Sequence, residues 1–118
     1  MRSIYKICPA SGWREAERQG VYRGSADDVR DGFIHFSTAA QLTETLRRYY
    51  VGADDLLLIA LDERALGDAL KWERAPSRGE DFPHLYAMLP LSAVTWTLPI
   101  ARDVHGTAIV PSMAFAPD

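Results

Sequence analysis

The chain has few of the residues that mark several common classes of protein. It contains 118 residues and a single cysteine, Cys8, so it lacks an internal disulfide and any Cys-x-x-Cys pair for structural zinc. The longest uninterrupted apolar run, Leu56 to Leu61, has six residues, against the roughly 20 of a transmembrane helix. Residues 1–6 lack the apolar core of a signal peptide. We therefore expect a cytoplasmic protein with no membrane segment.

Clustered positive charge is scarce as well. The net charge is −3, and Arg47-Arg48 is the only adjacent basic pair, so we expect no face for duplex DNA. Walker loops, Gly-x-Gly-x-x-Gly and His-Glu-x-x-His are all missing. The spacing of Asp31, His35 and His84 does not require a metal either. These absences disfavour standard nucleotide loops and a metal cofactor, and they leave open a pocket for one small anion.

Apolar residues make up 47% of the chain, enough for one domain with its own core. Alternation and helical periodicity predict strands at 3–8, 33–37, 55–62, 70–74, 84–88 and 95–101, a short extended piece at 21–25, and helices at 13–19 and after Thr38. The apolar run is expected at the centre of a sheet, residues 26–32 in a polar turn, and residues 75–83 in a mobile loop. The order predicts a single α+β domain over residues 1–110 and a loosely held C-terminal tail, 111–118.

The first candidate site lies on the strand at 33–37. Strand side chains alternate, so His35 and Ser37 share one face, while Ile34 and Phe36 take the other. Histidine is suited to proton transfer or to a polar ligand, and Ser37 lies where a helix start favours an anion. The alternative is a half-buried structural histidine followed by a helix cap.

The second candidate site lies near the strand at 84–88. Alternation puts His84 and Tyr86 on one face of that strand. Glu80 lies on the preceding loop, which would serve as a lid over the pocket. The alternative is a solvated acidic loop followed by an ordinary strand.

Further polar and aromatic residues complete the candidate set. Lys71 and Glu73 point the same way from their strand, either as a surface pair or with one of them at the pocket rim. Aromatic rings with polar tips are common both in ligand sites and in cores. The remaining candidates for ligand binding are Trp13, Tyr22 and Ser25, and for Trp13 we favour a place in the core.

A series of motifs resembles the bacterial and plant family of unknown function DUF952. The series is Ile4-Tyr5-Lys6-Ile7, Trp13, Gly20-x-Tyr22-x-Gly24-Ser25, Asp31-Gly32-Phe33-Ile34-His35-Phe36-Ser37-Thr38, Lys71-Trp72-Glu73 and Phe82-Pro83-His84-Leu85-Tyr86. The resemblance covers roughly residues 3–95, and its motif order is quite specific. The family name itself implies no activity.

That family is similar, more distantly, to the ADP-ribosyltransferase fold group, which includes the tRNA 2′-phosphotransferases. Ile34-His35-Phe36-Ser37 resembles the second half of the His-x-His-x-Ser stretch of those enzymes. The resemblance implies a split, strongly bent, mostly antiparallel β-sheet with flanking helices. It also implies a cleft for NAD or an ADP-ribose-like ligand, with His35 and one of Glu73 and Glu80 as catalytic residues. The first strand departs from the pattern, because it lacks the His or Arg that grips the dinucleotide.

Three functions stay open at this point. The first is an enzyme that acts on NAD, ADP-ribose or an RNA 2′-phosphate. The second is a non-catalytic module that binds a small metabolite in the same pocket. The third is a structural or interaction protein whose polar residues serve the fold alone. The sequence leaves the ligand and the oligomeric state undetermined.

Overall fold

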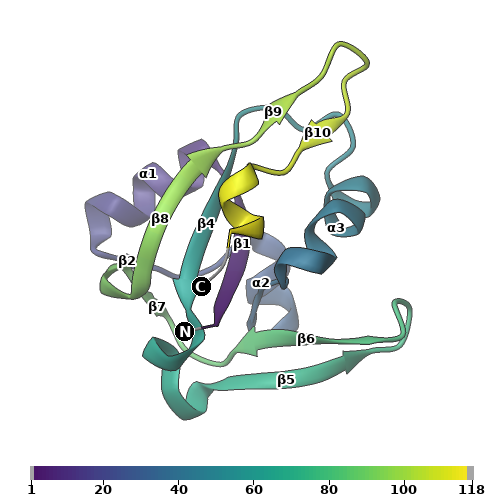
Figure 1. Ribbon diagram of the computed structural model, residues 1–118. Coiled ribbons are helices and arrows are strands. Elements are labelled where there is room, and N and C mark those ends of the chain that lie inside the picture. The colour runs from purple at the N-terminus through teal and green to yellow at the C-terminus, as the bar shows by residue number, and fades with distance from the viewer. Residues whose placement is uncertain (1, 117–118) are drawn as a thin grey trace.

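A computed structural model describes residues 2–116 and gives an α+β chain built on antiparallel sheets, as expected (Figure 1). The elements are β1 (Ser3–Pro9), α1 (Ala10–Gln19), β2 (Val21–Tyr22), α2 (Ala26–Asp31), β3 (Ile34–His35), η1 (Ala39–Gln41), α3 (Leu42–Tyr49), β4 (Leu56–Asp62), η2 (Glu63–Ala69), β5 (Leu70–Ala75), β6 (Glu80–Leu85), β7 (Leu89–Pro90), η3 (Leu91–Ala93), β8 (Val94–Pro99), β9 (Ala101–Arg102), β10 (Ala108–Ile109) and η4 (Ser112–Phe115). The η elements are 3-10 helices.

The largest sheet has the order β1-β4-β8, with both pairings antiparallel. The apolar run forms its central strand β4, in which Leu58, Ile59 and Leu61 are fully buried, so the predicted central position is confirmed. Strand β8 lies at the edge of this sheet, a position that suits Pro99 because proline cannot donate a hydrogen bond to a further strand.

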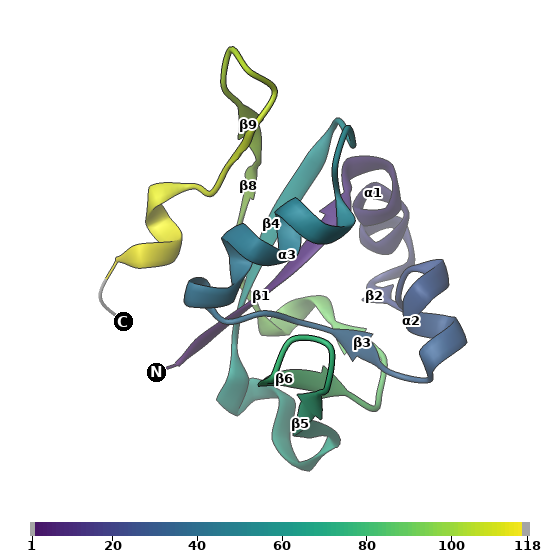
Figure 2. The same ribbon diagram turned by 90° about the vertical axis from the view of Figure 1, so that its right-hand side faces the viewer.

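A second three-stranded sheet, β3-β6-β5, runs across one end of the first (Figures 1 and 2). The chain just after β3 connects the two sheets. Ser37 and Tyr5 exchange backbone hydrogen bonds, at 2.8 Å from the Tyr5 amide and 2.9 Å from the Ser37 amide. The segment that carries His35 and Ser37 is therefore fixed between the two sheets.

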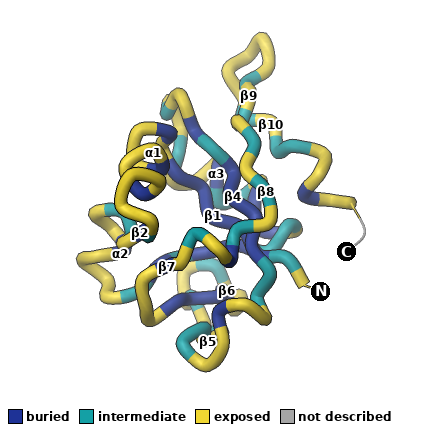
Figure 3. Tube along the Cα trace, turned by 90° about the vertical axis from the view of Figure 1, so that its left-hand side faces the viewer, coloured by how far each residue is buried: buried dark blue, intermediate teal, exposed yellow. Residues whose placement is uncertain are grey.

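The core lies on both faces of the first sheet. Alternation along β1 sends Ile4 and Cys8 into a cluster with α1, and sends Tyr5 and Ile7 into a cluster with α3. Figure 3 shows β1 and β4 as the buried interior, with the exposed sides of α1 and α2 outside them. Lys6 lies between Ile4 and Cys8 on β1 and is also buried.

Two predicted loops turn out to be regular structure. The polar turn predicted at 26–32 is the helix α2, Ala26–Asp31, with Gly32 as its C-cap, because the Ser25 hydroxyl and the Asp28 carboxylate cap its first turn reciprocally. Residues 75–83 are not a mobile loop, because β5 and β6 pair as a hairpin down to Ala75 and Glu80. The strand predicted at 84–88 therefore begins at Glu80 and ends at Leu85.

The C-terminal segment is more closely packed than the predicted loose tail. Residues Ser112–Phe115 form η4, Ala114 is buried, and its carbonyl accepts a hydrogen bond of 3.2 Å from the Tyr5 hydroxyl. Residues 117 and 118 of the predicted tail lie outside the described residues. Within residues 2–116, no helix is long and apolar enough to cross a membrane.

Candidate functional site

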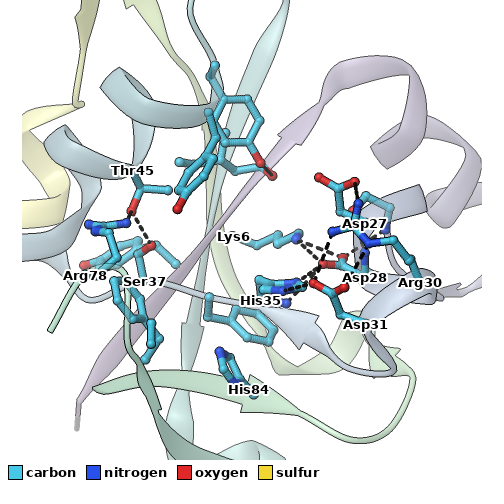
Figure 4. A pocket seen from close by; sticks show the side chains of 18 residues that line it. Lys6, Asp27, Asp28, Arg30, Asp31, His35, Ser37, Thr45, Arg78 and His84 are labelled. Atoms are coloured by element: carbon cyan, nitrogen blue, oxygen red, sulfur yellow. Dashed lines mark hydrogen bonds and ion pairs between the residues drawn. The ribbon is translucent and has the colours of Figure 1, made fainter. Parts of the chain in front are cut away.

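A cavity of about 310 Å³ opens where the two sheets, α2 and α3 meet (Figure 4). Of the predicted site residues, His35, Ser37, His84 and Ser25 line it. The two candidate sites meet here, because His35 and His84 are directly paired across β3 and β6 and their ring centroids lie 5.5 Å apart.

One side of the cavity is built on a buried ion pair that sequence reasoning missed. Lys6 from β1 and Asp28 from α2 lie 2.9 Å apart from Nζ to Oδ2, and both side chains are almost fully buried. Burial alone raises the pKa of Asp28, but the hydrogen bond from His35 and the charge of Lys6 outweigh it and hold that pKa below its ordinary value. Asp28 is therefore a fixed anion in the cavity wall.

His35 lies between two carboxylates. Its Nδ1 is 2.6 Å from Asp28 Oδ1, and its Nε2 is 3.0 Å from Asp31 Oδ2. Each ring nitrogen is therefore within hydrogen-bond distance of a carboxylate oxygen. His35 thus connects β3 to α2 through Asp28 and Asp31.

His84 has a different environment. Its Nδ1 lies 2.8 Å from Glu73 Oε1, the same oxygen that accepts a 2.6 Å hydrogen bond from the Tyr86 hydroxyl. Phe33 stacks on the His84 ring, with centroids 4.0 Å apart, and fixes its plane. Within residues 2–116, the other ring nitrogen of His84 has no hydrogen-bond partner.

The electrostatics of His84 favour a neutral ring. Burial lowers its pKa, and the nearby His35 acts in the same direction, while the contact with Glu73 opposes them. The carboxylate of Glu73 fixes the proton on Nδ1, so Nε2 carries the free lone pair. This arrangement can accept a proton from a ligand in the cavity.

The opposite side of the cavity holds hydroxyl groups and one arginine. Ser37 Oγ lies 3.2 Å from Thr45 Oγ1, which accepts a 3.1 Å hydrogen bond from Arg78. The predicted anion site at the helix start is not free there, because the Thr38 amide already donates to the Gln41 side chain at 3.0 Å.

Four predicted site residues lie away from the cavity. Trp13 and Tyr22 pack against each other in the core with ring centroids 5.6 Å apart, which agrees with the core placement favoured for Trp13. Lys71 is exposed on β5, and Glu80 is exposed at the start of β6. Glu73 and Tyr86 do not line the cavity either, but they contact it through His84.

The missed residues had weak signals in the sequence. Ser25-x-x-Asp28, followed by Gly32, is the pattern of a capped short helix, and it would have placed Asp28. A lysine between apolar residues on a strand, as Lys6 is, indicates a buried charge that needs a partner. The residues next to Arg78 in the sequence form no pattern that indicates a binding site. Within residues 2–116, no cluster of His, Cys, Asp and Glu is arranged to hold a metal ion.

Fold and site together define a small α+β domain with a polar cavity between two antiparallel sheets. The chain belongs to the family described as protein of unknown function (DUF952), whose model matches residues 7–97. The crystal structure of protein CC0527 from Caulobacter crescentus has a TM-score of 0.90 and 38% identity, and covers 97% of this chain and 99% of its own. Its solution NMR structure has a TM-score of 0.80 and 42% identity, with 90% of each chain covered. The comparison with curated proteins gave no match.

Proposed function

We propose that this chain is an enzyme that acts on a nucleotide-type ligand, with His84 as the general base. The observation that carries the proposal is the Glu73–His84 contact, which holds the proton on Nδ1 and leaves Nε2 for the ligand. Glu73 is then a positioning residue, and Tyr86 holds the same carboxylate oxygen from its other side. Phe33 keeps the imidazole plane fixed during proton transfer.

The ligand class follows from the cavity and from the motif series. A volume of about 310 Å³ lies at the small end of ligand pockets, which range from about 300 to 1,000 Å³. It suits a mononucleotide or one half of a dinucleotide such as NAD. Two sheets connected through the Ser37–Tyr5 bridge are compatible with the split, bent sheet of the ADP-ribosyltransferase fold group. NAD, ADP-ribose and an RNA 2′-phosphate are therefore the first substrates to test.

The test uses His84→Asn, because the asparagine amide can still donate to Glu73 but offers no basic nitrogen in place of Nε2. The matched control is His105→Asn, on an exposed residue in the turn after β9. Each protein is incubated with NAD, ADP-ribose and an RNA oligonucleotide that carries a 2′-phosphate, and products are identified by mass spectrometry. We expect conversion of at least one ligand and a loss of about 10²- to 10⁴-fold in rate for His84→Asn. No conversion of any of the three by the unmodified chain rejects the proposal.

A non-catalytic metabolite-binding module is the second candidate. This candidate is favoured because both ring nitrogens of His35 already contact the carboxylates of Asp28 and Asp31, which leaves neither nitrogen free to act on a ligand. Binding that raises the melting temperature, with the ligand recovered unchanged after long incubation, would decide for this candidate.

A further inference from the structure

The charges around the cavity are paired on one side only. Lys6 pairs with Asp28, and Arg30 pairs with Asp27 and Asp31. The third lining cation, Arg78, makes no ion pair with any carboxylate of residues 2–116. Its charge is therefore available to a ligand.

The protein holds the Arg78 guanidinium in place without using all its donors. It donates to Thr45 Oγ1 at 3.1 Å and to the Gln41 carbonyl at 3.5 Å, and it stacks over Phe82 with 4.6 Å from Cζ to the ring centroid. A guanidinium has five N–H groups, so most of them remain for a ligand. A fixed planar cation of this kind suits a phosphate, which it can bind through two oxygens at once.

Two hydroxyl groups complete the same side. The Thr45 hydroxyl donates to the Gln41 carbonyl at 3.0 Å, so in the contact with Ser37 the donor is Ser37. Rotation of the buried Ser37 hydroxyl would turn this hydrogen toward an anion in the cavity. Figure 4 places Ser37, Thr45 and Arg78 together, across the cavity from Asp28 and Asp31.

We infer that Arg78 and Ser37 form a subsite for a phosphate group of the ligand, and that Thr45 holds the Arg78 guanidinium in place. This inference rests on the proposed function for the identity of the cavity as the ligand site. The subsite orients the ligand: the lining cations on the other side are already paired with Asp27, Asp28 and Asp31, so the phosphate lies at the Arg78 end and the uncharged sugar lies toward the histidines.

The experiment titrates inorganic phosphate, ribose 5-phosphate and ribose into the full chain and follows the backbone amide and Arg Nε–H signals by NMR. Arg78→Gln removes the charge, and Arg74→Gln is the matched control, because Arg74 lies on the same hairpin but is exposed and outside the cavity. We expect phosphate to shift the signals of Ser37, Thr45 and Arg78. We also expect Arg78→Gln to weaken phosphate and ribose 5-phosphate about ten- to a hundredfold, with no change for Arg74→Gln.

The outcomes separate this subsite from the proposed function. If Arg78→Gln and the unmodified chain bind phosphate with equal affinity, the subsite is overturned. It is also overturned if the phosphate-induced NMR shifts are confined to other surfaces. A substrate converted normally by Arg78→Gln also overturns it, while the proposed function stands. Conversely, Arg78-dependent binding of ribose 5-phosphate without any conversion of NAD, ADP-ribose or the RNA supports the subsite and rejects the catalytic proposal.

Discussion

At the scale of single residues, the buried ion pair of Lys6 and Asp28 is the contact around the cavity whose mutation should cost the most stability. Removing one partner of a buried ion pair leaves the other charge without compensation, which costs about 3–5 kcal/mol. We expect Asp28→Asn to lower the free energy of unfolding by this amount, measured by urea denaturation. Asp28 also anchors His35, so the His35 ring signals should move in NMR spectra of the variant.

Asp27→Asn is the control for that change. Asp27 is the neighbouring residue on α2, but its side chain is 75% exposed and pairs with the exposed Arg30. Pairs of this kind contribute little, so the control should retain nearly full stability. Equal stability of the two variants would contradict the view that Asp28 organises this side of the cavity.

The lowered pKa of His84 predicts a pH dependence of stability. The unfolded chain binds a proton at this histidine near pH 6.5, whereas the folded chain binds it only at lower pH. The contribution is therefore present above about pH 6.5 and is lost as the pH falls through the folded pKa. We expect urea unfolding between pH 8 and pH 5 to show this loss in the unmodified chain and a flatter profile in His84→Asn. His105→Asn should keep the original profile, and an unchanged slope in His84→Asn would show that this ring is not desolvated.

At the scale of elements, the turn that enters α2 sets the position of Asp28. Gly24 has a φ of +108°, and a Cβ added there would lie 2.8 Å from Asp28 Cβ. Gly20, which ends α1, has a φ of +78° but open space around it. Both Gly→Ala changes should cost about 1–2 kcal/mol for the positive φ. We expect only Gly24→Ala to cost more than this, because it pushes Asp28 away from Lys6 and His35.

The melting temperatures of Gly24→Ala and Gly20→Ala give the comparison, together with the His35 ring signals. The Gly20 variant reports the backbone strain alone. If Gly20→Ala destabilises as much as Gly24→Ala and the His35 signals stay in place in both, the contact between residue 24 and Asp28 has no role.

The sequence predicted those elements whose pattern reflects burial. Strand alternation put His35 and Ser37 on the face that lines the cavity, because Ile34 and Phe36 on the other face pack into the core. Helix α2 was missed because it lacks an apolar face: its one large apolar side chain, Val29, is 70% exposed. The β5–β6 hairpin was missed because its outer part is polar, and hydrogen bonding rather than burial defines it.

At the scale of the whole molecule, the site depends on contacts between segments that are distant in the sequence. Alternation determines which side chains share a face of a strand, but it carries no information on which other segment lies opposite that face. Lys6, Asp28 and His84 come from three different elements, and only the joining of the two sheets brings them to one cavity. This is why the histidine strands were predictable and the ion pair and Arg78 were not.

The helix η4, Ser112–Phe115, lies beyond the predicted domain, 1–110, and its removal tests how far the fold extends. Ala114 packs in the cluster that holds Tyr5 and Leu42, and its carbonyl accepts the Tyr5 hydroxyl. A chain that ends at Val110 loses this packing and the hydrogen bond between Tyr5 and Ala114, so we expect a loss of about 1–3 kcal/mol in the free energy of unfolding. A chain that ends at Ala116 keeps the contact and should be more stable than the chain that ends at Val110. Equal stability of all three chains would mean that η4 adds nothing to the fold, and that the domain ends where the sequence alone placed its boundary.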